Sequence, residues 1–266
     1  MSISGLANRL SHEGGEIMAQ SMVVDVSEDW AIACDVQQQL MRHSKPASSA
    51  RITYSACCRQ ARALGGDFYD LLPLADHRVA LAIGDASGKS LPAALMMSSV
   101  QSSLRTAAHF AGHEPAAILG AVNSLVQATS LADRYATVFY GVFDETTRLL
   151  RYVNAGHIPP VIIRQDGSVA WLETGGAPIG MFPDWEYEEG AARLVPGDLL
   201  IACTDGITES ANSADEQWGM AGILTAIEHS EGASPDEIAR AIFAGMDEYS
   251  GGRQLDDATV VVAQAN

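Results

Sequence analysis

The chain has 266 residues, 47% of them hydrophobic, and a formal net charge of −17 at pH 7. This length and composition predict one large domain with an N-terminal appendage. The negative charge argues against a nucleic acid or an anionic membrane as a partner, because phosphate groups attract surfaces rich in Lys and Arg. No stretch reaches the roughly 18 apolar residues of a membrane-spanning helix, and residues 1–20 lack a signal-peptide pattern, so we expect a cytoplasmic protein.

The N-terminal part predicts an arm followed by one helix. Residues 1–27 are rich in Gly, Ser and acidic residues without a sustained period, which predicts a mobile arm. A helix is expected over residues 28–43, with Ser27 as its cap and Pro46 beyond its end. Its weak apolar face carries Trp30 and Leu40 and suits packing on the core or on another chain. We therefore expect residues 1–45 to be an arm with a linker helix and residues 46–266 to be the main domain.

The main domain alternates between groups of strands and groups of helices. Apolar runs bounded by turn residues predict strands at 51–58, 67–74, 78–84, 135–143, 149–154, 160–164, 169–172, 198–203 and 258–263. Helical spacing and first-turn prolines predict helices at 91–110, 115–131, 221–229 and 235–249. Because strands and helices come in blocks, the pattern favours an α+β fold over a doubly wound parallel sheet. We expect two antiparallel sheets stacked face to face, with helices outside.

Four short acidic motifs lie along the chain, each at the edge of a strand-like run. They are Gly65-Gly66-Asp67, Gly84-Asp85, Thr204-Asp205-Gly206 and Asp256-Asp257-Ala258-Thr259. Strands far apart in sequence could bring these carboxylates together at one end of a sheet. Ligand sets made only of oxygen suit Mg²⁺ or Mn²⁺ better than Zn²⁺, which usually recruits His or Cys. The motifs therefore indicate metal-assisted attack of water on a phosphate ester.

The four cysteines do not indicate a zinc site or a disulfide framework. No pair has the C-x₂₋₄-C spacing of a zinc ligand set. Cys57, Cys58 and Cys203 fall in apolar strand-like runs, so we expect them to be small buried hydrophobic residues without a chemical role.

Seven motifs in a fixed order resemble those of a known family. They are Gly65-Gly66-Asp67-Phe68-Tyr69-Asp70, Gly84-Asp85-Ala86-Ser87-Gly88-Lys89, Tyr135-Ala136-Thr137, Asn154-Ala155-Gly156-His157, Gly176-Ala177-Pro178-Ile179-Gly180, Thr204-Asp205-Gly206 and Asp256-Asp257-Ala258-Thr259. On these motifs the chain, from about Val36 to Val262, resembles a metal-dependent protein phosphatase of the PPM (type 2C) superfamily, in its SpoIIE-like, RsbU-like branch. Each motif alone is weak, but seven in order are specific.

The resemblance implies a fold, a metal site and a reaction. The fold would be a four-layer α-β-β-α sandwich with the metal site at one end, formed by residues 46–266 as the catalytic domain. Two Mn²⁺ or Mg²⁺ ions would bind at that end and activate a water molecule. The implied ligands are Asp67, Asp85, the carbonyl group of Ala86, Asp205 and Asp256, with Asp257 as the alternative to Asp256.

Three positions depart from the family pattern. Ala86 and Ser90 stand where the loop usually has Val or Gly and a final Gly, and Ser90 is expected to act as a helix N-cap instead. Ser87 stands where eukaryotic relatives carry a His that protonates the leaving group. No side-chain acid is therefore assigned, and both metal-bound water and Lys89 stay open as sources of that proton.

Substrate and partners follow from the resemblance alone. It implies dephosphorylation of phosphoserine or phosphothreonine on an anti-sigma-factor antagonist of the STAS fold, within a partner-switching pathway that controls a sigma factor. A helix at residues 28–43 would then bind a regulatory protein or mediate self-association. We expect His157 to be a structural histidine, and Asp70 to be either a polar group at a strand end or a support for the metal ligands.

The sequence also has features of three functional classes other than an active phosphatase. A pseudophosphatase, acting as a binding module without turnover, stays open because of Ala86 and Ser90. A P-loop NTPase is disfavoured, because Ile83 stands where its phosphate-binding loop requires Gly. A diguanylate cyclase, suggested by Gly65-Gly66-Asp67-Phe68, would explain none of the later motifs.

Overall fold

The computed structural model describes residues 28–41, 51–110, 114–129, 134–230 and 232–266. The chain divides into two compact units, Met1–Leu40 and Met41–Asn266. In the first unit the described residues, 28–40, are all helical, and residue 41 of the second unit is helical as well. The expected end of this helix at residue 43 lies outside the described residues. The expected arm over residues 1–27, together with Ser27 and Pro46, lies outside the described residues.

The second unit contains two sheets. The six-stranded sheet has the order β2-β3-β4-β5-β8, with β9 paired to β5. Its strands are β2 (Asp67–Leu74), β3 (Arg78–Ala86), β4 (Ala136–Asp144), β5 (Leu149–Ala155), β8 (Gly175–Gly176) and β9 (Gly190–Arg193). All its described pairings are antiparallel except that of β5 with β8, which is parallel. The expectation of a purely antiparallel sheet is therefore corrected at this edge.

The five-stranded sheet has the order β1-β11-β10-β6-β7. Its strands are β1 (Ile52–Arg59), β6 (Val161–Ile163), β7 (Val169–Trp171), β10 (Leu199–Cys203) and β11 (Ala258–Ala265). Its described pairings are antiparallel. Strand β11, which comes last in the chain, lies between β1 and β10 and is buried along nearly its whole length. The centre of this sheet therefore consists of strands far apart in sequence.

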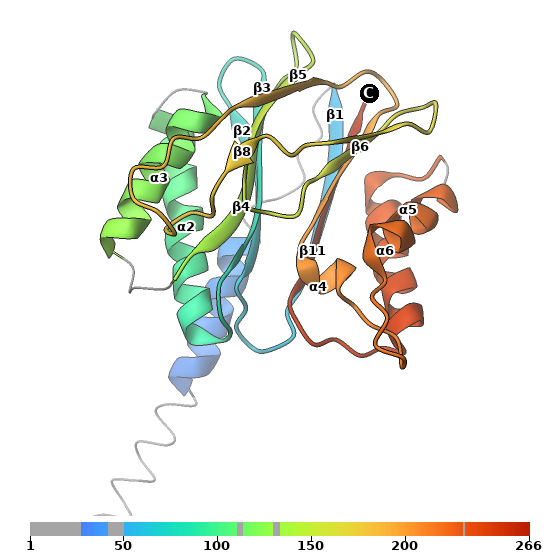
Figure 1. Cartoon of the computed structure of the whole chain (residues 1–266), viewed down its shortest axis with the longest axis horizontal. Coiled ribbons are helices and arrows are strands. Elements are labelled where there is room, and N and C mark those ends of the chain that lie inside the picture. Colours follow the sequence, from blue (N-terminus) through green and yellow to red (C-terminus); the bar gives the residue numbers. More distant parts are fainter. Residues whose placement is uncertain (1–27, 42–50, 111–113, 130–133, 231) are drawn as a thin grey trace, which may run out of the picture. The chain divides into compact units, whose positions relative to one another are not determined.

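Helices cover the outer faces of both sheets, as Figure 1 shows. Helices α2 (Leu91–Phe110) and α3 (Pro115–Thr129) pack on the six-stranded sheet, and α5 (Gly219–Glu228) and α6 (Pro235–Ser250) pack on the five-stranded sheet. Helix α6 begins with the capping box that its sequence predicts: Ser234 and Glu237 bond reciprocally. These four layers agree with the expected α-β-β-α sandwich.

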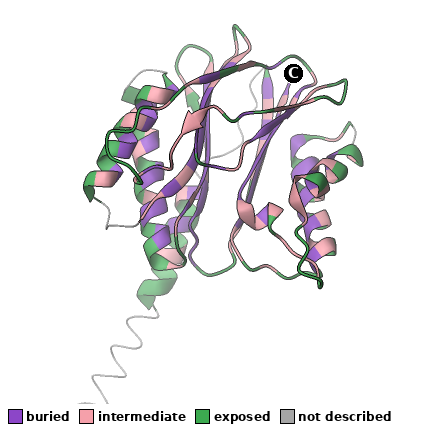
Figure 2. Cartoon of the chain, in the orientation of Figure 1, coloured by how far each residue is buried: buried purple, intermediate pink, exposed green. Residues whose placement is uncertain are grey.

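The core follows the same layers. One apolar cluster lies between the two sheets, where Ile83, Phe139 and Val261 are fully buried. Two further clusters fill the spaces between each sheet and its helices. Figure 2 shows the buried residues concentrated along the strands and on the inner faces of the helices. The two sheets thus form a rigid base for residues at their ends.

Three short elements were not expected from the sequence. Strand β8 has two glycines and β9 reads Gly-Ala-Ala-Arg, so neither has the β-branched residues that mark a strand. Both form because the edge of β5 offers them hydrogen-bonding partners. The third is α4 (Asp205–Thr208), a single turn that directly follows β10.

The expected burial of the strand cysteines is only partly correct. Cys203 is buried, but Cys57 is exposed and Cys58 is half-buried. Strand β1 is an edge strand, and its alternate residues Ile52 and Tyr54 point into the core. Cys57 lies on the other face of β1, which explains its exposure.

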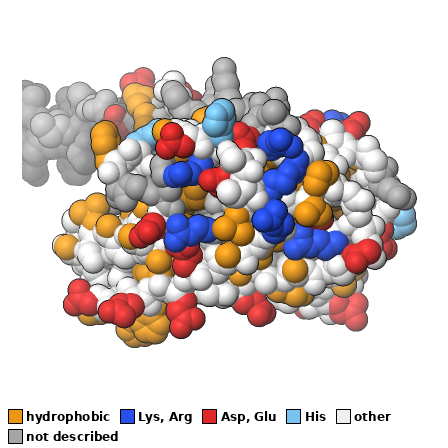
Figure 3. All heavy atoms as spheres, turned by 90° about the horizontal axis from the view of Figure 1, so that it is seen from above, with side chains coloured by type: hydrophobic (Ala, Val, Ile, Leu, Met, Phe, Trp, Pro, Cys, Tyr) orange, Lys and Arg blue, Asp and Glu red, His pale blue; other side chains and the backbone are white. Residues whose placement is uncertain are grey.

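The end of the sheets away from the acidic motifs carries arginines. Strand β3 begins at Arg78, β5 follows Arg148, and β9 ends at Arg193. Figure 3 shows the molecule from this end, with Lys and Arg side chains in blue. Arg78 pairs with Asp144 at 3.5 Å, and Arg148 donates a hydrogen bond of 2.8 Å to the carbonyl of Asn266. Charge is therefore distributed unevenly along the strands.

Within the described residues, no helix is both long enough and apolar enough to cross a membrane.

Candidate metal centre

Asp67 and Asp85 lie opposite each other at one end of the six-stranded sheet. Asp67 begins β2, Asp85 is the next-to-last residue of β3, and the antiparallel register pairs the two residues directly. Like charges at opposed positions of a strand pair repel each other. Burial and the charge of Asp85 hold the pKa of Asp67 well above its usual range. The pairing therefore concentrates negative charge at the sheet end.

Two threonines from the other sheet bind the Asp67 carboxylate. Thr204 Oγ1 and Thr259 Oγ1 each donate a hydrogen bond of 2.7 Å to Asp67 Oδ2. Thr204 Oγ1 also accepts a hydrogen bond of 2.9 Å from the Thr259 amide. All three residues are buried, with at most 1% of their surface exposed. These bonds join the two sheets at the acidic end and fix Asp67 Oδ2.

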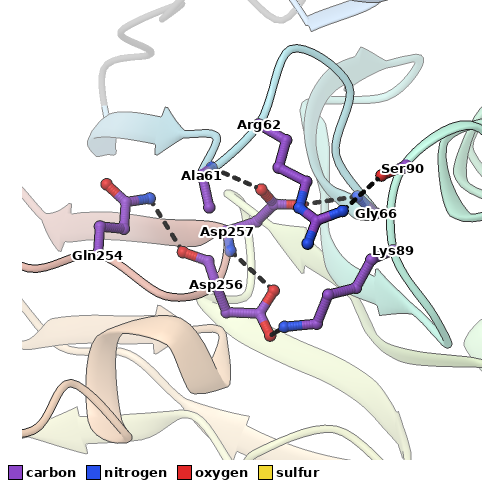
Figure 4. A network of polar contacts seen from close by, with 8 residues as sticks. All are labelled: Ala61, Arg62, Gly66, Lys89, Ser90, Gln254, Asp256 and Asp257. Carbon is purple, nitrogen blue, oxygen red and sulfur yellow. Dashed lines mark hydrogen bonds and ion pairs between the residues drawn. The ribbon is translucent and has the colours of Figure 1, made fainter.

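Asp257 is held by backbone amides. Its Oδ1 accepts a hydrogen bond of 2.8 Å from the amide of Ala61, and its Oδ2 accepts one of 2.8 Å from the amide of Gly66 (Figure 4). A side chain at Gly65 would overlap with Asp257 Oδ2, so the close approach requires glycine there. Each oxygen of Asp257 is thus already used to fix the loop before β2.

Asp85 lies among several other acids. Burial is the largest cause that raises its pKa, to about 7, followed by the charges of Asp205, Asp256 and Asp257. Asp85 Oδ1 and the carbonyl oxygen of Ala86 both border Gly66, since a Cβ atom on Gly66 would be 3.0 Å and 2.8 Å from them. The Asp85 carboxylate and the Ala86 carbonyl therefore both lie next to the loop before β2.

Asp205 comes to the same end from the five-stranded sheet. It follows β10 and begins α4. Its pKa is raised by burial first, then by the charges of Glu209 and Asp256, and it is lowered by Lys89. Asp205 is therefore close enough to Asp256 for their charges to interact.

Asp256 forms an ion pair with Lys89. The Lys89 ammonium lies 2.8 Å from Asp256 Oδ2, and Asp256 Oδ1 accepts a hydrogen bond of 3.0 Å from the amide of Asp257. Figure 4 shows Lys89 reaching across from the loop after β3 to the segment before β11. Both side chains are about half exposed, 51% for Lys89 and 48% for Asp256.

The loop that directly follows β3 and Asp85 is held by Arg134. Arg134 Nη1 donates a hydrogen bond of 3.2 Å to the carbonyl of Ser87 and lies over Gly88, where a side chain would overlap with it. Gly88 has a φ of 100°, which favours glycine. The Ser87 hydroxyl accepts a hydrogen bond of 3.0 Å from the amide of Tyr135. The loop is thus fixed by residues that directly precede β4.

Comparison with known proteins identifies the family. The family model described as Stage II sporulation protein E (SpoIIE) matches residues 75–266. The chain belongs to the SpoIIE family. The match covers the end of the sheets where Asp85, Asp205 and Asp256 meet, but it begins after Asp67.

Two curated relatives of this SpoIIE-family chain are similar over most of its length. Protein IcfG of Synechocystis sp. is 28% identical over 241 residues, which are 80% of this chain and 38% of that protein. Phosphoserine phosphatase RsbU of Bacillus subtilis is 27% identical over 241 residues, which are 90% of this chain and 70% of RsbU. The chain therefore spans well under half of the first relative and about two thirds of the second.

Two solved structures share the fold. The SiaA-PP2C domain of Pseudomonas aeruginosa has a TM-score of 0.76 and 21% identity, with 93% of this chain and 99% of that chain covered. The catalytic domain of the serine/threonine protein phosphatase PstP, solved with two manganese ions, has a TM-score of 0.59 and 18% identity, with 81% and 98% covered. These structures confirm the sandwich fold expected for a SpoIIE-family chain.

The donor set of this SpoIIE-family chain fits divalent cations. Burial first, and then the charges of neighbouring carboxylates, raise the pKa of Asp85 and of Asp205, and a hard cation would offset that charge. In the arrangement of side chains described here, no three carboxylate, imidazole or thiol groups among the described residues converge on one point. Carboxylates repel each other when no cation lies between them, so they are expected to close around one.

The departures from the family pattern have a structural explanation. Ser90 has a φ of 64°, in the left-handed region, whereas an N-cap residue has an extended backbone. Its hydroxyl accepts a hydrogen bond of 3.0 Å from Arg62. The expectation that Ser90 caps α2 is therefore wrong, and the position retains the conformation that a glycine would adopt.

Sequence reasoning missed three residues that support the site. Thr204 and Thr259 belong to the recognised acidic motifs, but nothing in the sequence showed that both bind Asp67 from the other sheet. Arg134 precedes the Tyr135-Ala136-Thr137 motif and carried no signal of its own. Asp70, whose role was open, pairs with Arg105 of α2 and contributes to packing.

Proposed function

We propose that this chain is a metal-dependent phosphatase that hydrolyses phosphoserine or phosphothreonine on a protein. The observation that carries the proposal is that Asp67, Asp85, Asp205 and Asp256 lie at the same end of the two sheets, where burial and mutual repulsion raise the pKa of three of them. Such uncompensated charge suits hard divalent cations. Membership of the SpoIIE family and the names of RsbU and PstP support the same activity.

The proposed ligands are Asp85, Asp205, Asp256 and the carbonyl of Ala86, with Asp67 in support. Asp256 is preferred over Asp257, because both oxygens of Asp257 accept hydrogen bonds from backbone amides. Asp67 would bind a metal ion through Oδ1, because its Oδ2 accepts hydrogen bonds from the hydroxyls of Thr204 and Thr259. We propose two Mn²⁺ or Mg²⁺ ions, in line with the two manganese ions of the PstP structure.

Some residues of the chain would bind the metal ions, and others would hold these ligands in place. Divalent cations held by the carboxylates supply a Lewis acid that activates water and offsets the charge of the phosphoryl oxygens. Thr204 and Thr259 hold Asp67 in one orientation, and Arg134 fixes the loop that presents Asp85. This support keeps the ligands from separating under their own repulsion.

No side chain is proposed as the proton donor to the leaving group. The Ser87 hydroxyl, at the position of the histidine in eukaryotic relatives, accepts a bond from the Tyr135 amide, and a serine hydroxyl is too weak an acid to replace a histidine. Lys89 is engaged with Asp256. A solvent-derived proton is therefore the simplest source.

The proposed substrate is a phosphorylated STAS-type protein in a partner-switching pathway that controls a sigma factor. RsbU, at 27% identity, is named a phosphoserine phosphatase, which supports the class of substrate. The substrate itself would be tested with a phosphorylated STAS domain, by loss of 80 Da per phosphate group in mass spectrometry, about the mass of one phosphoryl unit.

A hydrolysis assay tests the reaction. Wild type would be compared with Asp85→Asn and Asp205→Asn in Mn²⁺-dependent hydrolysis of an aryl phosphate, with EDTA as a further control. Asp166→Asn is the matched control, because Asp166 is an exposed turn acid that bonds Ser168. We expect activity that needs Mn²⁺ and both site aspartates but not Asp166.

The other outcomes are informative as well. Binding of Mn²⁺ without hydrolysis would indicate a core that needs a partner for activity. Absence of both Mn²⁺ binding and hydrolysis would favour a pseudophosphatase. Hydrolysis of GTP or ATP with loss of the aryl phosphate activity would favour a nucleotide enzyme.

We also propose that the helix at residues 28–41 docks on another chain or a regulator. It exposes Trp30, Ile32 and Val36 by 38%, 59% and 54%, and Ile32 and Val36 are one turn apart. Deletion of residues 1–45 is expected to change turnover while residues 46–266 keep their fold. Unchanged turnover and unchanged oligomeric state in that deletion would remove this proposal.

A further inference from the structure

The ion pair of Lys89 and Asp256 occupies an unusual position. Lys89 lies in the loop between β3 and α2, and Asp256 lies just before β11, so the pair joins the ends of the two sheets. Asp256 is one of the proposed metal ligands. The ammonium of Lys89 is therefore bound to an oxygen that a divalent cation would need.

The charge of Lys89 also acts on the neighbouring ligands. It lowers the pKa of Asp85 and of Asp205, against the repulsion of the surrounding acids. One ammonium thus interacts with Asp85, Asp205 and Asp256 together. The groups that face Lys89 include Asp257 and the guanidinium of Arg62 as well.

The Lys89 ammonium can leave Asp256 easily. Both side chains are about half exposed, and an exposed ion pair is weak because water competes for both groups. Lysine is a compact charge on a flexible stem, so its ammonium can turn without movement of the loop. A divalent cation at Asp256 would repel that ammonium and displace it.

We propose that Lys89 is a displaceable counter-ion, which neutralises Asp256 in the metal-free protein and turns to the phosphate of the substrate when a divalent cation takes that carboxylate. The inference rests on the proposed function for its second half. The released ammonium would lie at the mouth of the site, where the loop of residues 87–90 faces solvent. There it would add a positive charge for an anionic substrate.

Calorimetric titration of full-length protein with Mn²⁺ tests the first half. The proteins are wild type, Lys89→Met, Lys89→Arg, Asp256→Asn and the double variant Lys89→Met/Asp256→Asn. We expect Lys89→Met to bind Mn²⁺ about two to five times more tightly, the range that an exposed ion pair contributes. Lys89→Arg keeps the charge and should stay close to wild type.

The double variant distinguishes competition between Lys89 and Mn²⁺ for Asp256 from a general effect of the Lys89 charge on Mn²⁺ affinity. If Lys89 competes for Asp256, Lys89→Met should change Mn²⁺ affinity little once Asp256 is Asn. An equal gain in both backgrounds would mean that any positive charge nearby weakens binding, and it would overturn the proposal. Unchanged or weaker binding by the single Lys89→Met variant would also overturn it.

NMR of the wild type gives a second test. It does not depend on Asp256→Asn, which is expected to bind Mn²⁺ weakly. NMR spectra of isotope-labelled wild type report on the Lys89 side chain during titration with diamagnetic Mg²⁺. Its signals should shift as the hydrogen bond between the Lys89 ammonium and Asp256 is broken. Signals that stay fixed through saturation would contradict displacement. The unfolding temperature of each metal-free variant shows whether it is folded.

The second half is tested with inorganic phosphate as a competitive inhibitor at saturating Mn²⁺. Lys89→Met should raise its inhibition constant severalfold, and Lys89→Arg should restore part of the loss. An inhibition constant equal to that of wild type would overturn this half. If wild type binds Mn²⁺ but hydrolyses nothing by itself, the proposed activity needs a partner, while the Mn²⁺ titrations still decide whether Lys89 is a displaceable counter-ion.

Discussion

Asp70 in β2 is paired with Arg105 in α2, and the two residues join the six-stranded sheet to the helix that covers it. Arg105 Nη2 lies 3.1 Å from Asp70 Oδ1, and the Asp70 side chain is only 2% exposed. Arg105 is 22% exposed, so the pair is largely removed from water. The same strand carries Asp67 three residues earlier, and the pair therefore helps to fix the strand that positions it.

Asp70→Ala should destabilise the fold strongly, because it leaves the Arg105 guanidinium largely buried without its carboxylate. We expect a loss of about 3 to 5 kcal/mol in the free energy of unfolding. Urea denaturation measures it. Arg240→Ala, which breaks the exposed pair with Asp236, is the control and should have little effect. Equal effects of both variants would contradict a structural role for the buried pair.

Thr204→Val should cost more stability than Thr259→Val. The Thr204 hydroxyl donates to Asp67 and accepts from the Thr259 amide, so its loss leaves that buried amide without a partner and Asp67 Oδ2 with one hydrogen bond in place of two. Thr259 Oγ1 bonds Asp67 and the Cys58 thiol, so its loss leaves no backbone amide without a partner, and Asp67 keeps the bond from Thr204. Each orphaned buried group costs about 1 to 3 kcal/mol. Urea unfolding of both variants, with Thr204→Ser as the control that retains the hydroxyl, gives the ranking, and the reverse order would refute it.

Gly88→Ala should impair Mn²⁺ binding beyond its effect on folding. Gly88 and Gly167 both have a positive φ, 100° and 78°, so alanine is strained at either position, by about 1 to 3 kcal/mol. Only at Gly88 would the new methyl group displace Arg134, whereas the space around Gly167 is open. Calorimetry should show weaker Mn²⁺ binding for Gly88→Ala and unchanged binding for Gly167→Ala. Equal binding by both would show that Arg134 does not hold the loop.

Because of His157, the free energy of unfolding should be lower in mild acid than at neutral pH. Burial lowers its pKa from 6.5 to about 4, and Thr137 Oγ1 lies 3.1 Å from its Nδ1. The unfolded chain therefore binds a proton that the folded chain does not, between pH 6.5 and about 4. Stability from this residue is full above pH 6.5 and falls as the pH drops towards 4, by on the order of 3 kcal/mol.

The contribution of His157 can be isolated by difference. His157→Gln cannot titrate, so the stability gap between wild type and variant should shrink as the pH falls from 7 to 5. Urea unfolding at both values measures the gap. A gap that stays constant would show that His157 keeps an ordinary pKa. The raised pKa values of Asp67 and Asp85 act in the opposite direction, but they are common to both proteins.

Much of the fold was predictable because local signals and tertiary structure agree. Helix α2 has the expected bounds, since Pro92 marks its first turn and Ala, Leu and Met fill it. Strand β2 also has its expected bounds. By contrast, β9 consists of small residues and exists only because β5 pairs with it. A pattern within one segment cannot show a partner that lies elsewhere in the chain.

The candidate site was predictable in its acids but not in their support. Repeated placement of Asp67, Asp85, Asp205 and Asp256 at strand edges pointed to one end of the sandwich, where the structure brings them. The sequence analysis already prefers Asp256 over Asp257 as a ligand, and the hydrogen bonds from the Ala61 and Gly66 amides to Asp257 support that preference. The role of Ser90 was predicted wrongly, because a serine before a helix resembles an N-cap whatever its φ.

The position of β11 constrains how the protein is made. The chain leaves the ribosome from its N-terminus, and domains begin to fold as they emerge. Strands β2 to β5 follow one another and can pair early, whereas β1 and β10 are separated in their sheet by β11, which emerges after both. The acidic end, which needs Asp256 and Thr259, therefore cannot assemble during synthesis of the preceding strands. Until β11 is made, the edges of β1 and β10 that it will join have no strand partner, and unpaired strand edges can pair with other chains.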